Sequence, residues 1–497
     1  MTTVRKTKFM VTYGPSCKEF RILRRLIELG ADVFRFNGAH VKKANYGEIE
    51  KAIEFIRKTA AELGRVVAIF FDLGGVKFRL GSIGLDGKGK IELVEGQEVW
   101  IRAIEFSDDP SVLPFPDAEV LGALVPGNFV YIADGTVRLE VQTNDERGAW
   151  ARVQIGGEVS SHKGVNLPGV TINRPVLTND DMDMVAFGER LRVEWFGISY
   201  VYDGPSTKVA SDYIRKTRAK VMAKLERPEA CGGSNLDDIL EEVDAVMVAR
   251  GDLGVEGPRE DVPDAQEDIL KRSRKKTKLG MVGTQVLLSL KDEEQPSRGE
   301  VSGMVHDIRI DLAGSLLFSD EIAIGDHPEL VVQEADVIAR KAESRIAYYL
   351  EDLPANNKTE TTAKSACMQA RDYPNAVIIA ITSTGRTAIA VAKFLPEARI
   401  LAYAHDPYTL AQLAMVGGVE PVGVLPVADF NNLVASAIRE SINNGSLNPD
   451  VVEHVILVLG YVPGVTDSTN ATLHLDREDY LRLVATYQSQ EEAICVS

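Results

Sequence analysis

The sequence is poor in the residues that build disulfide frameworks and zinc sites. Its 497 residues include only four cysteines, none of them in a CxxC pair, at Cys17, Cys231, Cys367 and Cys495. Scattered cysteines of this kind are typical of reduced thiols in the cytoplasm, and they argue against a disulfide-stapled secreted domain. The seven histidines never stand at zinc-ligand spacing, so a zinc site is not expected either.

Long hydrophobic runs are also missing. A membrane-spanning helix needs about 20 apolar residues, whereas the apolar run at 66–71 stops at the length of a strand. The first six residues, MTTVRK, contain no apolar segment of the kind that a signal peptide carries. We therefore expect no membrane partner and a cytoplasmic location.

Basic residues are outnumbered by acidic ones. Lys and Arg number 56 against 73 Asp and Glu, which gives a net charge of −17. Because the phosphate backbone of a nucleic acid repels such a chain, we expect no nucleic-acid partner. A hydrophobic share of 45% beside a charged share of 26% is ordinary for a globular protein, and the length predicts about three domains.

Alternating strand and helix patterns organise most of the chain. In residues 1–81 and 166–345 eight short apolar strands alternate with helical stretches, which predicts an α/β fold, a (β/α)₈ TIM barrel. An open doubly wound sheet is the alternative. Residues 82–165 instead show short strands separated by Gly, Pro and Asp, which predicts an inserted small β-barrel lid domain. Residues 329–350 favour one long helix. Residues 346–497 are predicted to form a C-terminal α/β domain, with strands at 376–381, 400–403 and 455–459.

Polar residues gather where the predicted barrel strands end, which is the rim that carries the chemistry in barrel enzymes. They are cations, carboxylates and small polar residues: Arg35, Asn37, Asp72, Ser199, Lys224, Glu226, Arg250, Gly251, Asp252, Thr284, Ser319, Asp320 and Glu321. This mixture suits a divalent metal together with an anionic, phosphate-bearing substrate. Any single strand end is polar because strands end at solvent, so the prediction depends on the whole set.

Two segments of this rim indicate the chemistry more sharply. Lys224 and Glu226 alternate along an extended segment, which places an ammonium and a carboxylate on the same side. Residues 249–254 offer glycine amides beside Asp252, and amides of this kind can hold an anion while the carboxylate holds Mg²⁺. Together they favour phosphoryl-transfer or enolate chemistry. Salt bridges across the barrel mouth are the alternative.

A second candidate site lies in the C-terminal domain, where a loop joins a predicted strand to a predicted helix. Its residues are Thr382, Ser383, Thr384, Gly385, Arg386 and Thr387. Hydroxyls and amides at a helix N-terminus can bind an anion, and simple capping of the helix is the alternative interpretation. The segment is not a P-loop, because no GK[ST] follows.

Motifs along nearly the whole chain, from about residue 5 to 475, resemble the pyruvate kinase family. In chain order they are 7–8 with 14–15 (TK and GP), 35–40 (RFNGAH), 163–169 (KGVNLPG), 223–226 (AKLE), 247–256 (MVARGDLGVE), 283–285 (GTQ) and 296–301 (PSRGEV). KGVNLPG and MVARGDLGVE match the family's segments without a change. The resemblance implies a barrel with a β-rich lid inserted in it, a C-terminal α/β effector-binding domain and a homotetramer.

The reaction that this resemblance implies is phosphoryl transfer from phosphoenolpyruvate to ADP, giving pyruvate and ATP in glycolysis. Glu226 and Asp252 would hold Mg²⁺ or Mn²⁺. Lys224 would stabilise the phosphoryl group in flight, which is an electrostatic task, and Arg35 would also contact phosphate.

Further roles follow from the same resemblance. Amides near Gly251 and Asp252 would hold the substrate carboxylate, and Thr284 would sit beside the methylene carbon and orient proton delivery. Asp134 in the lid would face the cleft. The nucleotide would be bound by Arg79, His40 and Lys163.

The chain departs from the family at the site for a monovalent cation. Many members bind K⁺ through Asn, Ser, Asp and Thr side chains. Here Asn37 and Asp72 remain, while Ala39 and Leu73 replace the two hydroxyl ligands. Lys77 stands where K⁺-independent members carry lysine. The resemblance therefore implies a vestigial site at which the Lys77 ammonium supplies the positive charge and K⁺ is not required.

Regulation and activity leave alternatives open. By resemblance, the 382–387 loop would bind a phosphorylated allosteric effector. Altered segments such as 286–288 and 313–321 keep a second function open, that of a catalytically weakened relative that senses a metabolite. A third is a Mg²⁺-dependent aldolase or lyase acting on a pyruvate enolate, which the lid disfavours because an aldolase needs no nucleotide lid.

Overall fold

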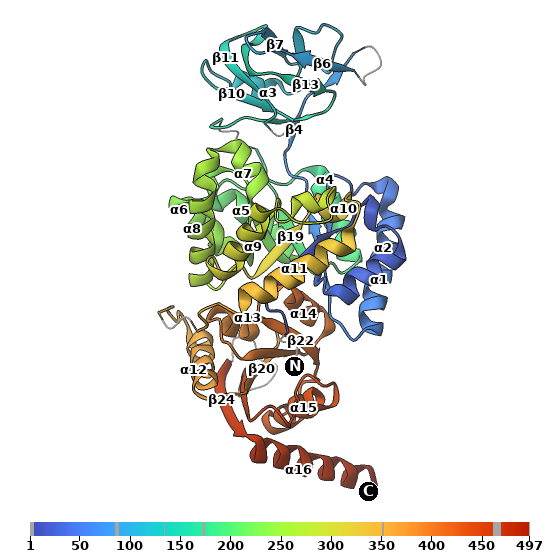
Figure 1. Cartoon of the computed structure of the whole chain (residues 1–497), viewed down its shortest axis with the longest axis vertical. Helices are drawn as coiled ribbons and strands as arrows, with labels where there is room; N and C mark the ends of the chain where they lie inside the picture. Colours follow the sequence, from blue (N-terminus) through green and yellow to red (C-terminus); the bar gives the residue numbers. More distant parts are fainter. Residues whose placement is uncertain are drawn as a thin grey trace.

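The computed structural model describes residues 4–84, 89–133, 135–170, 174–349, 352–460 and 469–496, with 488–496 by their backbone alone. These residues form three bodies stacked along the long axis of the molecule (Figure 1). A β-rich body lies at one end and a barrel in the middle. An α/β body lies at the other end, where the chain finishes in helix α16 (Arg477–Val496).

Eight parallel strands close into the central barrel, which confirms the predicted fold, and the open doubly wound alternative is wrong. The strands are β1 (Lys8–Thr12), β2 (Val33–Asn37), β3 (Ala68–Asp72), β15 (Trp195–Ile198), β16 (Lys220–Leu225), β17 (Ala245–Ala249), β18 (Leu279–Gly283) and β19 (Ser315–Phe318). The circle closes where Lys8 of β1 pairs with Ser315 of β19. β3 and β17 are buried over their whole length, which is why both appear in the sequence as continuous apolar runs.

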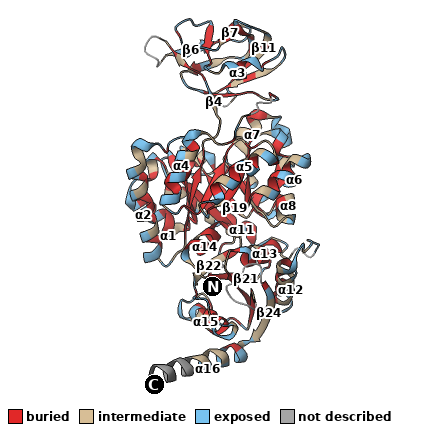
Figure 2. Cartoon of the chain, turned by 180° about the vertical axis from the view of Figure 1, so that it is seen from behind, coloured by how far each residue is buried: buried red, intermediate tan, exposed pale blue. Residues whose placement is uncertain are grey.

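Helices surround the barrel, and their inner faces are buried while their outer faces are exposed (Figure 2). The helices of this body are α1 (Phe20–Leu29), α2 (Tyr46–Glu62), α4 (Asn179–Arg190), α5 (Gly204–Arg215), α6 (Gly233–Glu242), α7 (Arg250–Glu256), α8 (Val262–Lys275), α9 (Arg298–Arg309), α10 (Asp320–Ala323) and α11 (Pro328–Glu343).

The long helix expected over 329–350 is shorter than predicted. It is α11, and it ends at Glu343. The Tyr348 hydroxyl donates to the Glu343 carbonyl at 3.1 Å, so a side chain satisfies one of the carbonyls that a longer helix would have used. Tyr349 then has a φ of +70°, which is incompatible with a continuing right-handed helix.

The insert is β-rich, as expected, and it packs around one hydrophobic core. A seven-stranded sheet runs in the order β4-β14-β10-β11-β12-β7-β9, and two further sheets pair β13 with β6 and β5 with β8. The elements are β4 (Phe78–Arg79), β5 (Ser82–Ile83), β6 (Lys90–Leu93), β7 (Glu98–Arg102), β8 (Phe106–Ser107), β9 (Val112–Pro114), α3 (Ala118–Gly122), β10 (Phe129–Ile132), β11 (Val137–Asp145), β12 (Gly148–Ile155), β13 (Gly157–Ser160) and β14 (Gly164–Asn166). β4 and β14 pair side by side, so the two chain segments that connect insert and barrel run together.

The C-terminal body is an α/β domain, as predicted, with a five-stranded sheet in the order β22-β21-β20-β23-β24. Its elements are α12 (Lys358–Asp372), β20 (Ala376–Thr382), α13 (Arg386–Lys393), β21 (Arg399–Ala404), α14 (Pro407–Gln412), β22 (Val419–Val424), α15 (Phe430–Asn443), β23 (His454–Gly460), β24 (Thr469–Asp476) and α16. Only β24 runs antiparallel to its neighbour in this sheet. Hydrophobic clusters cover both faces of the sheet, which is buried throughout its centre (Figure 2).

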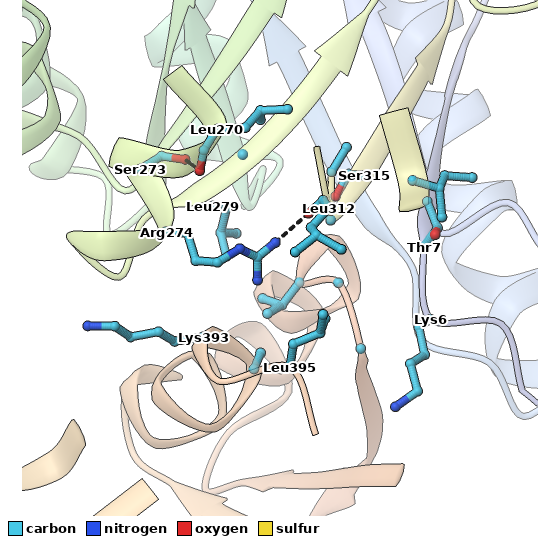
Figure 3. A pocket seen from close by; sticks show the side chains of 18 of the residues that line it. Lys6, Thr7, Leu270, Ser273, Arg274, Leu279, Leu312, Ser315, Lys393 and Leu395 are labelled. Atoms are coloured by element: carbon cyan, nitrogen blue, oxygen red, sulfur yellow. Dashed lines mark hydrogen bonds between the residues drawn. The ribbon is translucent and has the colours of Figure 1, made fainter. Parts of the chain in front are cut away.

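The C-terminal domain packs against the barrel. A short 3₁₀ turn, η6 (Leu413–Met415), packs Ala414 and Met415 into one cluster with residues from all eight barrel strands. The Ser315 hydroxyl donates to the Met415 carbonyl at 2.8 Å. Beside this contact lies a small cavity of about 70 Å³. Figure 3 shows it between the two domains, with the Arg274 side chain directed toward Leu312, to whose carbonyl it donates.

Candidate active site

The predicted rim residues line two adjoining cavities at the carboxyl ends of the barrel strands. The cavities measure about 1050 Å³ and 660 Å³, and both include Lys77 and Asp252 in their walls. The larger one is also lined by Arg35, Asn37, Asp72, Arg79, Ser199, Lys224 and Glu226, and the smaller one by Arg250, Gly251, Thr284, Ser319, Asp320 and Glu321. The barrel therefore brings the predicted set to one mouth, where barrel enzymes carry their chemistry.

Lys224 joins three neighbouring strand ends. Its Nζ lies 2.7 Å from Glu226 Oε1 and 3.2 Å from Asp72 Oδ1, and it donates to Ser199 Oγ at 3.0 Å. Burial lowers the pKa of a lysine, but Asp72 and Glu226 outweigh that effect and raise the pKa of Lys224. The side chain, which is only 11% exposed, therefore remains a permanent cation at the cavity wall.

Arg35 supplies a second buried cation. Its Nη2 lies 2.6 Å from Asp72 Oδ2, its Nε donates to the same oxygen at 2.8 Å, and its Nη1 donates to Thr12 Oγ1 at 3.0 Å. Burial would raise the pKa of Asp72, yet Lys224 and Arg35 hold it below the usual range. Asp72 therefore acts as a buried anion that fixes two cations at the cavity.

The two predicted metal ligands follow neighbouring strands, β16 and β17. Burial, with a contribution from Asp252, raises the pKa of Glu226 to about 7 although Lys224 opposes the shift. Glu226 and Asp252 both line the larger cavity, where two carboxylates can attract one shared cation. Among the residues that the structure describes, no three His, Cys, Asp or Glu side chains gather as a complete metal site. The pair suits Mg²⁺, which commonly takes one or two carboxylates and completes its shell with substrate phosphate and water.

Tyr200 touches both of these carboxylates, and the sequence analysis missed it. Its backbone N–H donates to Glu226 Oε2 at 2.7 Å, and its hydroxyl donates to Asp252 Oδ1 at 3.4 Å. The available signal was its place in the chain, one residue after Ser199 at the end of β15.

Thr284 is held in an unusual backbone conformation. Thr284 and Gln285 have φ values of +63° and +52°, in the left-handed region that non-glycine residues rarely adopt. Arg250 donates to both of their carbonyls, at 3.1 Å and 3.2 Å, and Gly251 N donates to Thr284 Oγ1 at 3.1 Å. The Thr284 hydroxyl oxygen accepts in its bond with Gly251, so that bond does not use the hydroxyl hydrogen.

Arg250 is itself fixed from behind by a residue that the sequence analysis did not find. Its Nη1 lies 3.1 Å from Asp307 Oδ2, and Gln266 Nε2 donates to Asp307 Oδ1 at 2.8 Å. Asp307 is 2% exposed and lies on α9, far from Arg250 in the chain, so no spacing pattern could have linked the two.

The predicted nucleotide residues are less closely grouped. Arg79 lines the larger cavity and donates from Nη1 to the His162 carbonyl at 3.0 Å. His40 and Lys163 are exposed and do not line either cavity. Asp134 lies outside the described residues. These nucleotide roles stay predictions.

The residues of the predicted vestigial cation site line the larger cavity. Lys77 Nζ is 3.8 Å from Asp252 Oδ1, and Asn37 Oδ1 accepts from the Ala39 N–H at 3.1 Å. Leu73 is buried, with 1% of its surface exposed. No hydroxyl oxygen is therefore contributed at positions 39 and 73.

The 382–387 loop forms the N-terminal end of α13. Gly385 has a φ of +85°, which suits glycine, and its N–H donates to Thr382 Oγ1 at 2.9 Å. Thr387 is buried and shares a hydrogen bond of 2.8 Å with Thr469 of β24. Arg386 is exposed. Whether the loop binds an effector stays a prediction.

The structure bears on two features of the whole chain, its membrane-spanning potential and its cysteines. Across the described residues, no helix has both the length and the apolar character needed to cross a bilayer. Cys17, Cys231 and Cys367 are buried free thiols, and burial raises the pKa of Cys17 to about 11.

Comparison with known proteins agrees with this geometry. The family model described as "Pyruvate kinase, barrel domain" matches residues 4–332, and "Pyruvate kinase, alpha/beta domain" matches residues 360–473. A protein named pyruvate kinase from Methylorubrum extorquens is 32% identical over 95% of this chain and 97% of its own length. One of the same name from Agrobacterium vitis is 31% identical over 94% and 97%, and "Pyruvate kinase 2" of Synechocystis is 32% identical over 94% and 78%. The chain therefore belongs to the pyruvate kinase family.

Proposed function

We propose that the protein transfers a phosphoryl group from phosphoenolpyruvate to ADP and releases pyruvate and ATP. The observation that carries this proposal is the arrangement around Lys224. An invariably charged ammonium, a second cation at Arg35 and the carboxylates of Glu226 and Asp252 meet at one barrel mouth. This is the electrostatic equipment that phosphoryl transfer requires, since that reaction depends on positioning and charge stabilisation.

Lys224 and Arg35 would receive the substrate phosphate. Both cations are already oriented by Asp72, so they need no reorganisation when charge develops on the phosphoryl oxygens. The phosphorus–enolate oxygen bond breaks while a β-phosphate oxygen of ADP bonds to phosphorus. Lys224 would accompany the group throughout the transfer because its ammonium is held at the cavity wall by Glu226 and Asp72.

The enolate left behind must gain a proton at its methylene carbon. Thr284 would orient that proton, since its hydroxyl oxygen accepts from Gly251 and its own hydrogen is available to the cavity. The clamp of Arg250 on the backbone of Thr284 and Gln285 keeps this hydroxyl in place. The β-rich insert above the mouth would exclude water, which competes as a phosphoryl acceptor.

Glu226 and Asp252 would hold Mg²⁺ or Mn²⁺, which when bound neutralises charge on the substrate phosphate and carboxylate. Two carboxylates on adjacent strand ends, without a third protein ligand in the described residues, leave coordination positions for the substrate.

We also propose that K⁺ is not required. Each oxygen of Asp72 already faces a cation, Lys224 or Arg35, so this carboxylate needs no further ion. Lys77 places a tethered ammonium 3.8 Å from Asp252, at the wall where K⁺ would add positive charge.

The remaining parts of the proposal concern regulation, assembly and location. The 382–387 loop would bind a phosphorylated effector, the enzyme would act as a homotetramer, and its place would be the cytoplasm. The position of this loop at the N-terminal end of α13, where backbone amides can bind an anion, supports the first part. Buried free thiols are compatible with a reducing compartment.

A coupled assay of pyruvate formation tests the reaction. We expect pyruvate to form only when phosphoenolpyruvate, ADP and Mg²⁺ are all present, and in the absence of K⁺ and Na⁺ at constant ionic strength. Lys224→Met should lose the activity, and the matched control Lys271→Met, at an exposed position on α8, should keep it. Pyruvate release from an aldol adduct of pyruvate, with neither phosphoenolpyruvate nor ADP present, would instead support the lyase alternative. No pyruvate under any of these conditions would support the metabolite sensor.

A further inference from the structure

Tyr200 occupies a position between the two carboxylates of the proposed metal site. It follows β15, while Glu226 follows β16 and Asp252 lies just after β17, so the three residues come from three adjacent strand ends. Its N–H donates to Glu226 Oε2 at 2.7 Å, and its hydroxyl donates to Asp252 Oδ1 at 3.4 Å. One residue thus contacts both carboxylates through two different groups.

These contacts restrain the orientation of both carboxylates. Glu226 is held on both sides, by Lys224 at Oε1 and by the Tyr200 N–H at Oε2. On Asp252 the contacts of Tyr200 and Lys77 both fall on Oδ1, so the carboxylate is restrained through this oxygen. Hydrogen-bond donors behind a ligating carboxylate set its orientation, and their loss typically weakens metal binding by about 10- to 100-fold.

The backbone of Tyr200 is held in a conformation that such a role requires. Its φ is +54°, in the left-handed region that a bulky residue adopts only when the surroundings enforce it. Gly75 provides the space. A Cβ atom at Gly75 would lie 3.1 Å from Ser199 Cβ and 3.3 Å from Tyr200 Cδ2. The turn that brings the Tyr200 N–H to Glu226 and the Tyr200 hydroxyl to Asp252 therefore requires a glycine at position 75.

We infer that Tyr200 is a positioning residue for the divalent cation, holding Glu226 and Asp252 in the orientation that binds it. This inference rests on the proposed metal site of the preceding section. It predicts that the Tyr200 hydroxyl affects the affinity for the cation even when no substrate is bound. A tyrosine that merely packs against the cavity wall would leave that affinity unchanged.

Titration of the substrate-free protein with Mn²⁺, followed by electron paramagnetic resonance, measures this affinity without reference to activity. Tyr200→Phe removes one hydroxyl and keeps the ring and backbone, and thermal melting verifies that it folds. We expect its dissociation constant for Mn²⁺ to rise by about tenfold or more. Tyr202→Phe is the matched control, because the Tyr202 hydroxyl donates to the Arg174 carbonyl at 3.2 Å and does not serve the carboxylates.

A steady-state measurement adds a second readout. The Mg²⁺ concentration for half-maximal activity should rise in Tyr200→Phe, while kcat at saturating Mg²⁺ stays within about threefold of the unaltered enzyme. Equal Mn²⁺ affinity in Tyr200→Phe and the unaltered chain would overturn the inference and leave the metal site intact. If Glu226→Gln binds Mn²⁺ as tightly as the unaltered chain does, the metal site itself is wrong and the inference fails with it.

Discussion

Arg250 supports the backbone that carries Thr284, and its replacement by methionine should separate the stability of the barrel from its turnover. The guanidinium donates to the carbonyls of Thr284 and Gln285 and pairs with Asp307 at 3.1 Å. Methionine fills a similar volume but can make none of these bonds. Two left-handed residues would then lack the donor that fixes them.

The structure sets the size of both effects. Asp307 is 2% exposed, and removal of one partner of a buried ion pair costs about 3–5 kcal/mol of unfolding free energy. The lower end applies, because Arg250 is 18% exposed and solvent screens part of its attraction to Asp307. The left-handed conformation costs roughly 1–2 kcal/mol per residue. Thr284 and Gln285 would therefore lower their conformational free energy by leaving it once the Arg250 donor is removed. A displacement of about 1 Å at a catalytic group can cost about 10² in turnover.

Urea unfolding and the coupled pyruvate assay measure the two quantities on the same protein. We expect Arg250→Met to lose about 3 kcal/mol of stability and about 10² in kcat. Combined with Asp307→Leu, it should recover part of the stability, because no orphan carboxylate remains, and none of the turnover. Turnover of Arg250→Met within about threefold of the unaltered enzyme would refute the reasoning.

Four further predictions follow from single groups. Lys224→Met should reduce kcat by about 10²–10³ with little change in the KM for phosphoenolpyruvate, as steady-state kinetics will measure. Lys77→Glu should lower activity about tenfold, because it sets a second negative charge beside Asp252, a proposed metal ligand. K⁺ should restore the activity only in part. Burial raises the pKa of Glu321 to about 7, so its proton stabilises the fold fully below pH 4.5 and that stability is lost as pH rises through 7. Unfolding profiles should show this loss as about 3 kcal/mol, and Glu321→Gln should flatten it. Arg386→Ala with Thr387→Ala should abolish activation by a phosphorylated metabolite without lowering the maximal rate. If no phosphorylated metabolite shifts the substrate saturation curve of the unaltered enzyme, the loop only caps helix α13 and binds no effector.

The fold was predictable where the burial of an element produces a recognisable hydrophobic pattern in the sequence. The barrel strands are buried on both faces and appear as short apolar runs. By contrast, β22 and β24 were missed, and both lie at the edges of the C-terminal sheet. β22 carries Pro421 and Gly423, which an edge strand tolerates and which hide the strand pattern. The end of α11 was missed because it depends on Tyr348, whose hydroxyl folds back to Glu343.

The site was predictable to the extent that topology fixes it. Lys224, Glu226 and Asp252 stand at strand ends, and a parallel barrel brings all strand ends to one rim. Tyr200 could not be predicted in its role, because its hydrogen bonds depend on a left-handed turn that only the packed structure reveals. Asp307 reaches Arg250 across 57 residues of chain, and such a pairing leaves no local pattern.

The turn at η6 makes the barrel and the C-terminal domain inseparable. Ala414 and Met415 share one buried cluster with barrel residues that include Met10, Trp195 and Met247, so part of the barrel core is supplied by another domain. A barrel excised from this chain would expose methionine and tryptophan side chains of this cluster to solvent. We expect it to aggregate rather than to work as a smaller enzyme. Exchange of C-terminal domains between relatives is therefore constrained, because Ala414 and Met415 of η6 must fit the barrel residues that they contact. A functional chimera must carry η6 together with the barrel that it fits.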